Sequence, residues 1–344
     1  MRLALQTPKL SDDAISMIGS GKLQPADLAL VISLLEGGDV EPWRCVTLSY
    51  GQRLDHLSAG DIQPLLDALK RMGAPVLWAA IEIVFMYLYD GRSPARTLIR
   101  TVKSILLSRD LFDGVNRGTM DGHYFHESVS WLAKHGAVDD KFARNMTRQF
   151  VRLARLADSD VFFALDDPAR TILQTLIKSH PQQVWGELSK EFEGKDPVRR
   201  HRLGRLLRQD REDWLGAGLL FELPRELYLD WIRAKPETRA FLAVPWLPVA
   251  LEQRDGSLAW HPAMAAFVEE FGGQPNVLRA VSDRLRPSSW SGSLAGYLEP
   301  LVPLVSGWLV HSSPAVRAWA AATLDILRRW IESEREDDED SYRP

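Results

Sequence analysis

Hydrophobic residues recur along this chain at spacings of three and four, the period of an amphipathic helix, and strict alternation is scarce. Short breakers such as Gly37-Gly38 and Gly272-Gly273 separate these stretches, as is usual between neighbouring helices. Three of the clearest stretches carry Leu65, Leu66, Leu69 and Met72; Leu203, Leu206 and Leu207; and Ala320, Leu324, Leu327 and Ile331. The pattern predicts an all-α protein built from many helices of moderate length.

Four predicted helices begin with Ser-Pro or Asp-Pro and an arginine close behind, at residues 93–96, 167–170, 196–199 and 313–317. The Ser or Asp oxygen can accept a hydrogen bond from a free backbone N–H at the N-cap. Proline fits the first helical position, where its missing N–H is not needed. Ser-Pro and Asp-Pro are also common helix openers, so an alternative interpretation is that these starts have no deeper relation.

The prolines of these four starts are 74, 29 and 117 residues apart. The first and last intervals are close to two and three lengths of a two-helix repeat, which is about 40 residues. A pair of helices cannot bury its hydrophobic stripe alone, whereas stacked pairs form one continuous core. The spacing therefore predicts a repetitive array of helix pairs.

Residues 299–331 resemble a HEAT-type repeat. A helix beginning near Glu299 leads through a turn to Pro314-Ala315-Val316-Arg317, and small residues follow at Ala320 and Ala321. Residues 61–80 are similar, with a shorter first helix. The resemblance implies an α-solenoid of stacked antiparallel helix pairs over residues 1–331, with a broad concave face that binds a partner.

The match to HEAT repeats has one clear departure. HEAT repeats commonly place an Asp shortly before the Val-Arg pair, and Asp167 and Asp196 stand in comparable places, whereas Ser313 does not. An Arg-to-Asp ladder between repeats is therefore in doubt at this end of the chain. The Trp-rich and Arg-rich style is also similar to the helical arrays of bacterial antiviral-defence proteins, which implies a sensing or assembly part of a defence complex.

Charge and cysteine content narrow the class of protein. The chain of 344 residues has 42 basic and 46 acidic side chains, a net charge of −4 that argues against a generally basic nucleic-acid binder. Cys45 is the single cysteine, so an internal disulfide and a four-cysteine zinc site are excluded and a reducing compartment is favoured.

Membrane and tail signals complete this picture. The most apolar run, residues 75–89, contains Glu82 and is shorter than the ~20 residues that cross a bilayer. The first residues lack the long apolar core of a signal peptide, so we expect a cytoplasmic protein with no membrane association. Seven acids lie between Glu332 and Asp340, and we expect residues 332–344 to form a short disordered tail.

Two basic stretches are candidates for binding an anionic partner. The first stretch contains Arg199, Arg202, Arg205 and Arg208, and on a helix the last three lie opposite a leucine face. In the second stretch, Arg96, Arg100 and Lys103 follow Arg92 at spacings of four, four and three. Each stretch fits either a site for phosphates or acidic segments or an ordinary solvated helix face. The sequence does not show whether the two stretches line one groove.

His123, His126 and Glu127 are weak candidates for a metal site or a proton relay, because they would share one helix face. Zinc proteases place such histidines four positions apart with the Glu directly after the first one, whereas here the histidines are three positions apart and the Glu follows the second. We therefore favour an ordinary polar helix surface and expect no metal. Nucleotide-binding glycine loops and the Gly-x-Ser-x-Gly elbow are missing, so we expect no cofactor, no small-molecule substrate and no enzymatic activity.

These observations predict a non-enzymatic scaffold or adaptor that binds a protein partner through its concave face. The alternative is a helical-repeat protein that binds nucleic acid through its Arg-rich helix faces, for which salt-dependent binding would be expected.

Overall fold

The computed structural model describes most of the chain, and this described part is all-α apart from one two-stranded hairpin. The chain divides into two compact units, Met1–Leu176 and Ile177–Pro344. Each unit is compact by itself, and one continuous array over residues 1–331 stays a prediction. The described residues are 22–51, 53–89, 95–113, 120–156, 159–194, 196–207, 216, 218–286 and 292–341.

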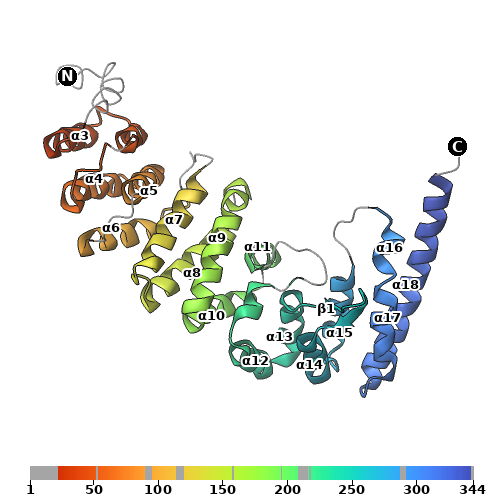
Figure 1. The fold of residues 1–344 in the computed structure, drawn as a ribbon. Coiled ribbons are helices and arrows are strands. Elements are labelled where there is room, and N and C mark those ends of the chain that lie inside the picture. The colour runs from red at the N-terminus through yellow and green to blue at the C-terminus, as the bar shows by residue number, and fades with distance from the viewer. Residues whose placement is uncertain are drawn as a thin grey trace. The chain divides into compact units, whose positions relative to one another are not determined.

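Helices follow one another in chain order through the first unit (Figure 1). From α3 to α7 each helix packs on the next, and α4 also packs on α6 while α5 packs on α7. Packing on both the next helix and the one after it is what two layers of helices produce. The elements are α3 (Pro25–Gly37), η1 (Pro42–Ser49), α4 (Ala59–Arg71), α5 (Ala74–Leu88), α6 (Arg96–Leu106), α7 (Asp121–Lys134), α8 (Asp140–Arg155) and α9 (Ser159–Ser179), which ends in the second unit.

Local sequence explains these helices well. At the start of α4 the Ser58 hydroxyl accepts from the Asp61 backbone N–H, and the Asp61 carboxylate accepts from the Ser58 backbone N–H at 2.8 Å. Such a capping box stabilises a helix by about 1 kcal/mol. Leu65, Leu66 and Leu69 are fully buried on the face that the periodicity predicts.

One predicted helix start is wrong. Pro168 lies inside α9, although Asp167-Pro168 has the sequence of a helix opener. A proline inside a helix loses one backbone hydrogen bond and crowds the preceding turn, at a cost of about 3 kcal/mol. Pro168 packs closely on α7, because a Cβ atom on Gly122 would lie only 2.7 Å from the Pro168 ring. Pro197 and Pro314 do begin α11 and α18, whereas Pro94 lies outside the described residues.

The second unit has shorter helices and ends in a long one. α18 packs against α15, α16, α17 and η4. Trp260 and Trp308 stack with parallel rings 3.6 Å apart, and the Trp260 indole donates to the Leu304 carbonyl at 2.8 Å. The elements are α10 (Pro181–Phe192), α11 (Pro197–Leu207), η2 (Leu219–Glu222), α12 (Arg225–Ala234), α13 (Pro236–Ala243), η3 (Val244–Trp246), β1 (Ala250–Glu252), β2 (Leu258–Trp260), α14 (Pro262–Phe271), α15 (Pro275–Leu285), α16 (Leu294–Leu298), α17 (Leu301–Ser306), η4 (Gly307–Val310) and α18 (Pro314–Ser341).

The β1–β2 hairpin was not expected from the hydrophobic pattern. Its strands are antiparallel, with Ala250 opposite Trp260 and Glu252 opposite Leu258. The dipeptide Asp255-Gly256 is a typical turn sequence and could have predicted the hairpin. In the turn, Gly256 adopts φ +80° and the Asp255 carboxylate accepts a hydrogen bond from the Ser257 backbone N–H. Strands of three residues carry too few positions for alternation to be recognised.

The acidic end of the chain differs from the expectation of disorder. α18 continues to Ser341, ten residues beyond Ile331, and residues 342–344 lie outside the described part. Glutamate is a good helix former, and Arg335 of this segment pairs with Glu299 at 2.6 Å. The predicted disordered tail is therefore not confirmed over residues 332–341.

Arg317 of α18 binds the loop that precedes its own helix. Arg317 donates to the backbone carbonyls of His311 and Ser312 at 2.6 and 2.8 Å. Ser313 stands where an Asp was expected before Val316-Arg317, and here Arg317 binds the backbone of the turn that precedes α18. Along the described helices, none combines the length and the hydrophobicity needed to span a bilayer.

Candidate functional site

The basic stretch on α6 is shorter than predicted. Arg96 and Arg100 are exposed, but Lys103 is largely covered and its ammonium lies 2.6 Å from the Asp139 carboxylate. Asp139 also caps α8, so Lys103 holds the end of α6 against the start of α8. Arg92 lies outside the described residues.

The α11 stretch is engaged within the second unit. Arg199 is half-buried and bonded to Glu191 of α10, and neither Arg202 nor Arg205 is free of interactions. Arg208 lies outside the described residues. The two predicted stretches belong to different units.

The predicted metal candidates do not converge on one point. His126 Nδ1 lies 3.1 Å from a Glu127 oxygen and its Nε2 lies 3.3 Å from the Ser130 hydroxyl, whereas the His123 ring packs edge-on against Phe85. Among the described residues, no group of three or more His, Cys, Asp or Glu side chains is arranged to hold a metal ion.

A cavity of about 670 Å³ opens between α5 and α7 in the first unit, and His123 and Glu127 line it. Helix α5 and the residue after it contribute Phe85, Leu88 and Tyr89; α7 contributes Glu127, Ser128, Trp131 and Lys134, with His135 at its end. This volume lies within the range of sites that bind small ligands or single side chains.

Two buried polar atoms of this cavity wall are unusual. Among the described residues, no hydrogen-bond partner is found for the Trp131 indole N–H or for the Ser128 hydroxyl. Ser128 is only 1% exposed, and the Trp131 ring lies 4.8 Å from the His135 ring. A buried polar group without a partner costs about 1–3 kcal/mol. Because the Trp131 indole N–H is closed to solvent, a bound acceptor would recover part of this energy only after the ring turns toward the cavity.

Aromatic side chains form the other end of the cavity. Phe85 packs on Tyr124 and Tyr89 with ring centroids 4.9 and 5.7 Å apart. Tyr89 is 74% exposed, so a large ring faces solvent at the rim. Large exposed rings of this kind are frequent anchors in protein interfaces.

Glu82 of α5 is held by a hydrogen bond from Tyr50. The Tyr50 hydroxyl donates to the Glu82 carboxylate at 2.7 Å, linking η1 to α5. Burial, and then the neighbouring Glu82 carboxylate, raises the pKa of Tyr50 and of Tyr124. The one acid in the apolar run of residues 75–89 therefore has a structural partner, which its position in the sequence did not reveal.

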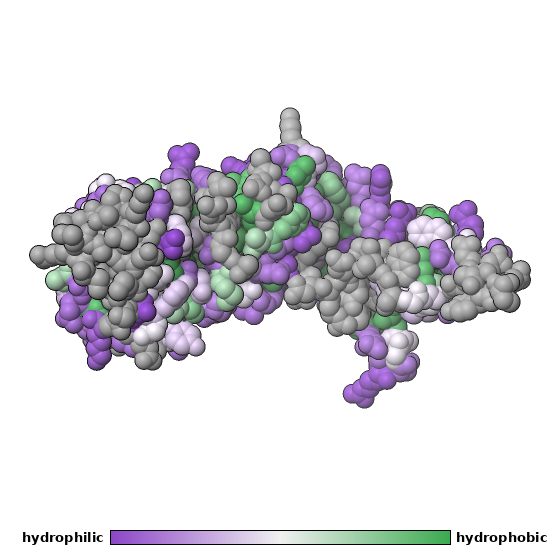
Figure 2. All heavy atoms as spheres, turned by 90° about the horizontal axis from the view of Figure 1, so that it is seen from above, coloured by the Kyte–Doolittle hydropathy of each residue, from purple (hydrophilic) through white to green (hydrophobic). Residues whose placement is uncertain are grey.

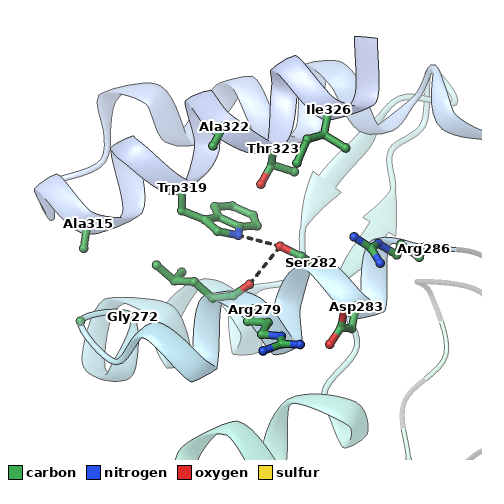
Figure 3. A pocket seen from close by; sticks show the side chains of 12 residues that line it. Gly272, Arg279, Ser282, Asp283, Arg286, Ala315, Trp319, Ala322, Thr323 and Ile326 are labelled. Atoms are coloured by element: carbon green, nitrogen blue, oxygen red, sulfur yellow. Dashed lines mark hydrogen bonds between the residues drawn. The ribbon is translucent and has the colours of Figure 1, made fainter. Parts of the chain in front are cut away.

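A second cavity, of about 540 Å³, lies between α15 and α18 (Figure 3). Here the Trp319 indole donates to the Ser282 hydroxyl at 2.8 Å, and Ser282 in turn donates to the Leu278 carbonyl. Arg279 and Arg286 also line the cavity. Because its indole is already bonded, this cavity offers less unmet hydrogen-bonding capacity than the one in the first unit.

A basic helix face that the sequence analysis missed is found on α8. Figure 2 shows hydrophilic side chains over much of the described surface, with hydrophobic ones between them. Beyond Asp140, the exposed residues of α8 are Lys141, Arg144, Arg148, Arg152 and Arg155. Their spacing of three, four, four and three was the available signal, but they are too far apart in sequence to stand out as a run.

Comparisons with protein families, with curated proteins and with solved structures give no match to this chain, so the likeness to HEAT-type repeats is carried by the sequence pattern.

Proposed function

We propose that this protein is a non-enzymatic helical-repeat adaptor, an α-solenoid of the HEAT type, that binds a protein partner. The observation that carries the proposal is the cavity between α5 and α7. Its lining includes the solvent-facing Tyr89 ring and Trp131, whose buried indole N–H has no hydrogen-bond partner among the described residues. We assign this cavity as the contact point for a segment of the partner.

The packing of the first unit supports the repeat part of the proposal. Contacts of α4 with α6 and of α5 with α7 follow the order expected for stacked helix pairs. In such arrays each pair presents one side to solvent, and recognition residues lie on that side.

A polypeptide matches the chemistry of this wall. Its backbone carbonyls would accept from Trp131 once the indole turns toward the cavity, and an apolar side chain would be covered by Phe85 and Tyr89. Glu127 and Lys134 place one charge of each sign at the same cavity, which suits a mixed peptide better than a uniformly charged polymer.

Location and pathway belong to the same proposal. A reducing compartment, with the cytoplasm as its default, agrees with a single thiol, Cys45, that is buried and free. Membership of a bacterial defence complex follows from the resemblance described above and is proposed on that ground.

A photo-crosslinking residue in place of Tyr89 tests the proposal in the native cell. We expect adducts with a polypeptide, and we expect Trp131→Phe, which removes the indole N–H and keeps a ring, to lower the adduct yield about 5- to 10-fold, the factor that corresponds to one lost hydrogen bond. Trp43 is the matched control, since it is an aromatic residue of the same unit, is 54% exposed and does not line the cavity. Equal adducts from positions 43 and 89, or none with a polypeptide from 89, would remove the proposal.

A further inference from the structure

Helix α8 has two sharply different faces. Phe142, Met146, Phe150 and Leu153 are at most 1% exposed and fix one face in the core. The exposed positions after Asp140 are all cationic, and we name them the α8 ridge: Lys141, Arg144, Arg148, Arg152 and Arg155. Arg148 and Arg155 also interact within the protein, as the α11 arginines do, but every ridge residue is exposed, whereas Arg199 and Arg202 are half-buried.

The α8 ridge has the dimensions of a polymer-binding surface. At 1.5 Å per residue, positions 141 to 155 span about 21 Å along the helix. One strand of duplex DNA carries a phosphate per ~3.4 Å of axis, so a duplex lying along the ridge carries about six phosphates of each strand over this length. Five cations over this length therefore have a matching number of anions in a nucleic-acid backbone.

Other exposed arginines lie beside the ridge or on the helix α6 that is anchored to α8. Arg152 donates to the backbone carbonyl of Arg109, itself exposed, so Arg109 lies beside the ridge. The Lys103–Asp139 ion pair anchors the end of α6 at the start of α8, and exposed Arg96 and Arg100 lie on that α6 helix. The predicted α6 cations thus belong to the unit that carries the ridge.

The composition of the ridge distinguishes nucleic acid from an acidic protein. A protein interface needs an apolar core, and every apolar side chain of α8 is buried beneath the ridge. Nucleic-acid interfaces are strongly cationic and polar, and arginine binds phosphate through two parallel hydrogen bonds. Four of the five ridge cations are arginines.

We propose that the α8 ridge binds the sugar-phosphate backbone of nucleic acid without sequence preference. This site is separate from the proposed α5–α7 protein contact. The fixed, buried half of α8 presents the cations as a rigid row that can contact phosphates whatever bases they carry.

Fluorescence anisotropy of the whole protein with labelled 30-nucleotide single- and double-stranded DNA and RNA tests the proposal. With about five phosphate contacts, log K should fall against log salt with a slope near −4.5 for duplex DNA, which is about a 500-fold loss between 50 and 200 mM salt. A flat salt response, or no binding at 50 mM, overturns the proposal.

Paired variants locate the site. Arg144→Glu with Arg148→Glu should weaken binding at least 30-fold and reduce the salt slope by about two. Arg328→Glu with Arg329→Glu on α18 is the control of equal charge change at exposed positions and should leave the slope unchanged. Equal effects of both pairs would mean that net charge alone governs binding and would overturn the proposal.

Two further comparisons complete the test. Arg144→Gln with Arg148→Gln, a milder change, reports on the site if the Glu variant loses its helical circular dichroism. Poly-glutamate is the acidic-protein probe, and tighter binding of it than of any oligonucleotide would assign the ridge to an acidic protein and sink the nucleic-acid proposal. Adducts from position 89 should persist in every ridge variant, so failure here and failure of the protein-contact proposal are distinguishable.

Discussion

Ser128→Ala should make the protein more stable, against the usual effect of a core substitution. Ser128 is 1% exposed, and its hydroxyl has no partner among the described residues. Removing such a group recovers part of a desolvation cost of about 1–3 kcal/mol, and alanine adds a few tenths of a kcal/mol of helix propensity. We expect the free energy of unfolding of the first unit to rise by about 1–2 kcal/mol.

Differential scanning calorimetry of the free protein measures this change. For a unit of this size, 1 kcal/mol moves the midpoint by about 2–4 °C, so the transition of the first unit should rise by about 2–8 °C. The transition of the second unit should stay in place, which provides an internal reference.

Thr147→Val is the matched control on α8. Thr147 is fully buried like Ser128, but its hydroxyl donates to the Ala143 carbonyl at 2.9 Å. Losing that bond should lower stability by about 1 kcal/mol. If Ser128→Ala instead lowers the midpoint as Thr147→Val does, the Ser128 hydroxyl is paired in solution and the wall of the α5–α7 cavity is already satisfied.

Three other substitutions or conditions give distinct outcomes. Asp139→Ala removes the α8 N-cap and should lower the free energy of unfolding in urea by about 1–2 kcal/mol. The hydrogen bond from Lys103 lowers the pKa of Asp139. The stabilising contribution of Asp139 should therefore be present above about pH 4 and disappear as the pH falls through the depressed folded pKa. Gly122→Ala places a methyl group 2.7 Å from the Pro168 ring, so the free energy of unfolding should fall by about 1–3 kcal/mol and the thermal midpoint should fall with it. A rise in the midpoint of the size expected from helix propensity would mean that α7 and α9 are further apart. Burial raises the pKa of Cys45 to about 12, so a thiol reagent at pH 8 should react only after denaturant is added, and rapid labelling of the native protein would contradict this.

The two proposed surfaces make different demands on the first unit. The α5–α7 cavity presents rings and one charge of each sign, whereas the α8 ridge presents cations alone. An adaptor that binds a protein and a nucleic acid at the same time needs two surfaces of different composition, one aromatic with mixed charge and one cationic. The crosslinking and anisotropy experiments examine each surface with the other left intact.

The helical class and the buried faces were predictable from local pattern. Spacing of three and four places Leu203, Leu206 and Leu207 on one side of a helix, and all three are fully buried. Pro197 begins α11 as expected, with Asp196 accepting from the first backbone N–H groups. These features depend on residues within one or two turns of each other, which a single sequence contains completely.

Other features were decided only by tertiary packing. Pro168 reads as a helix start, yet α9 continues through it against Gly122 of another helix. Lys103 was expected to belong to a free basic stripe and is instead paired with Asp139, 36 residues away. Tertiary burial leaves the Trp131 indole N–H without a hydrogen-bond partner among the described residues, and the α8 ridge is defined by which residues the core leaves exposed. Periodicity states which side of a helix is polar, but burial by distant neighbours decides which polar groups stay in solvent and which lose their partners.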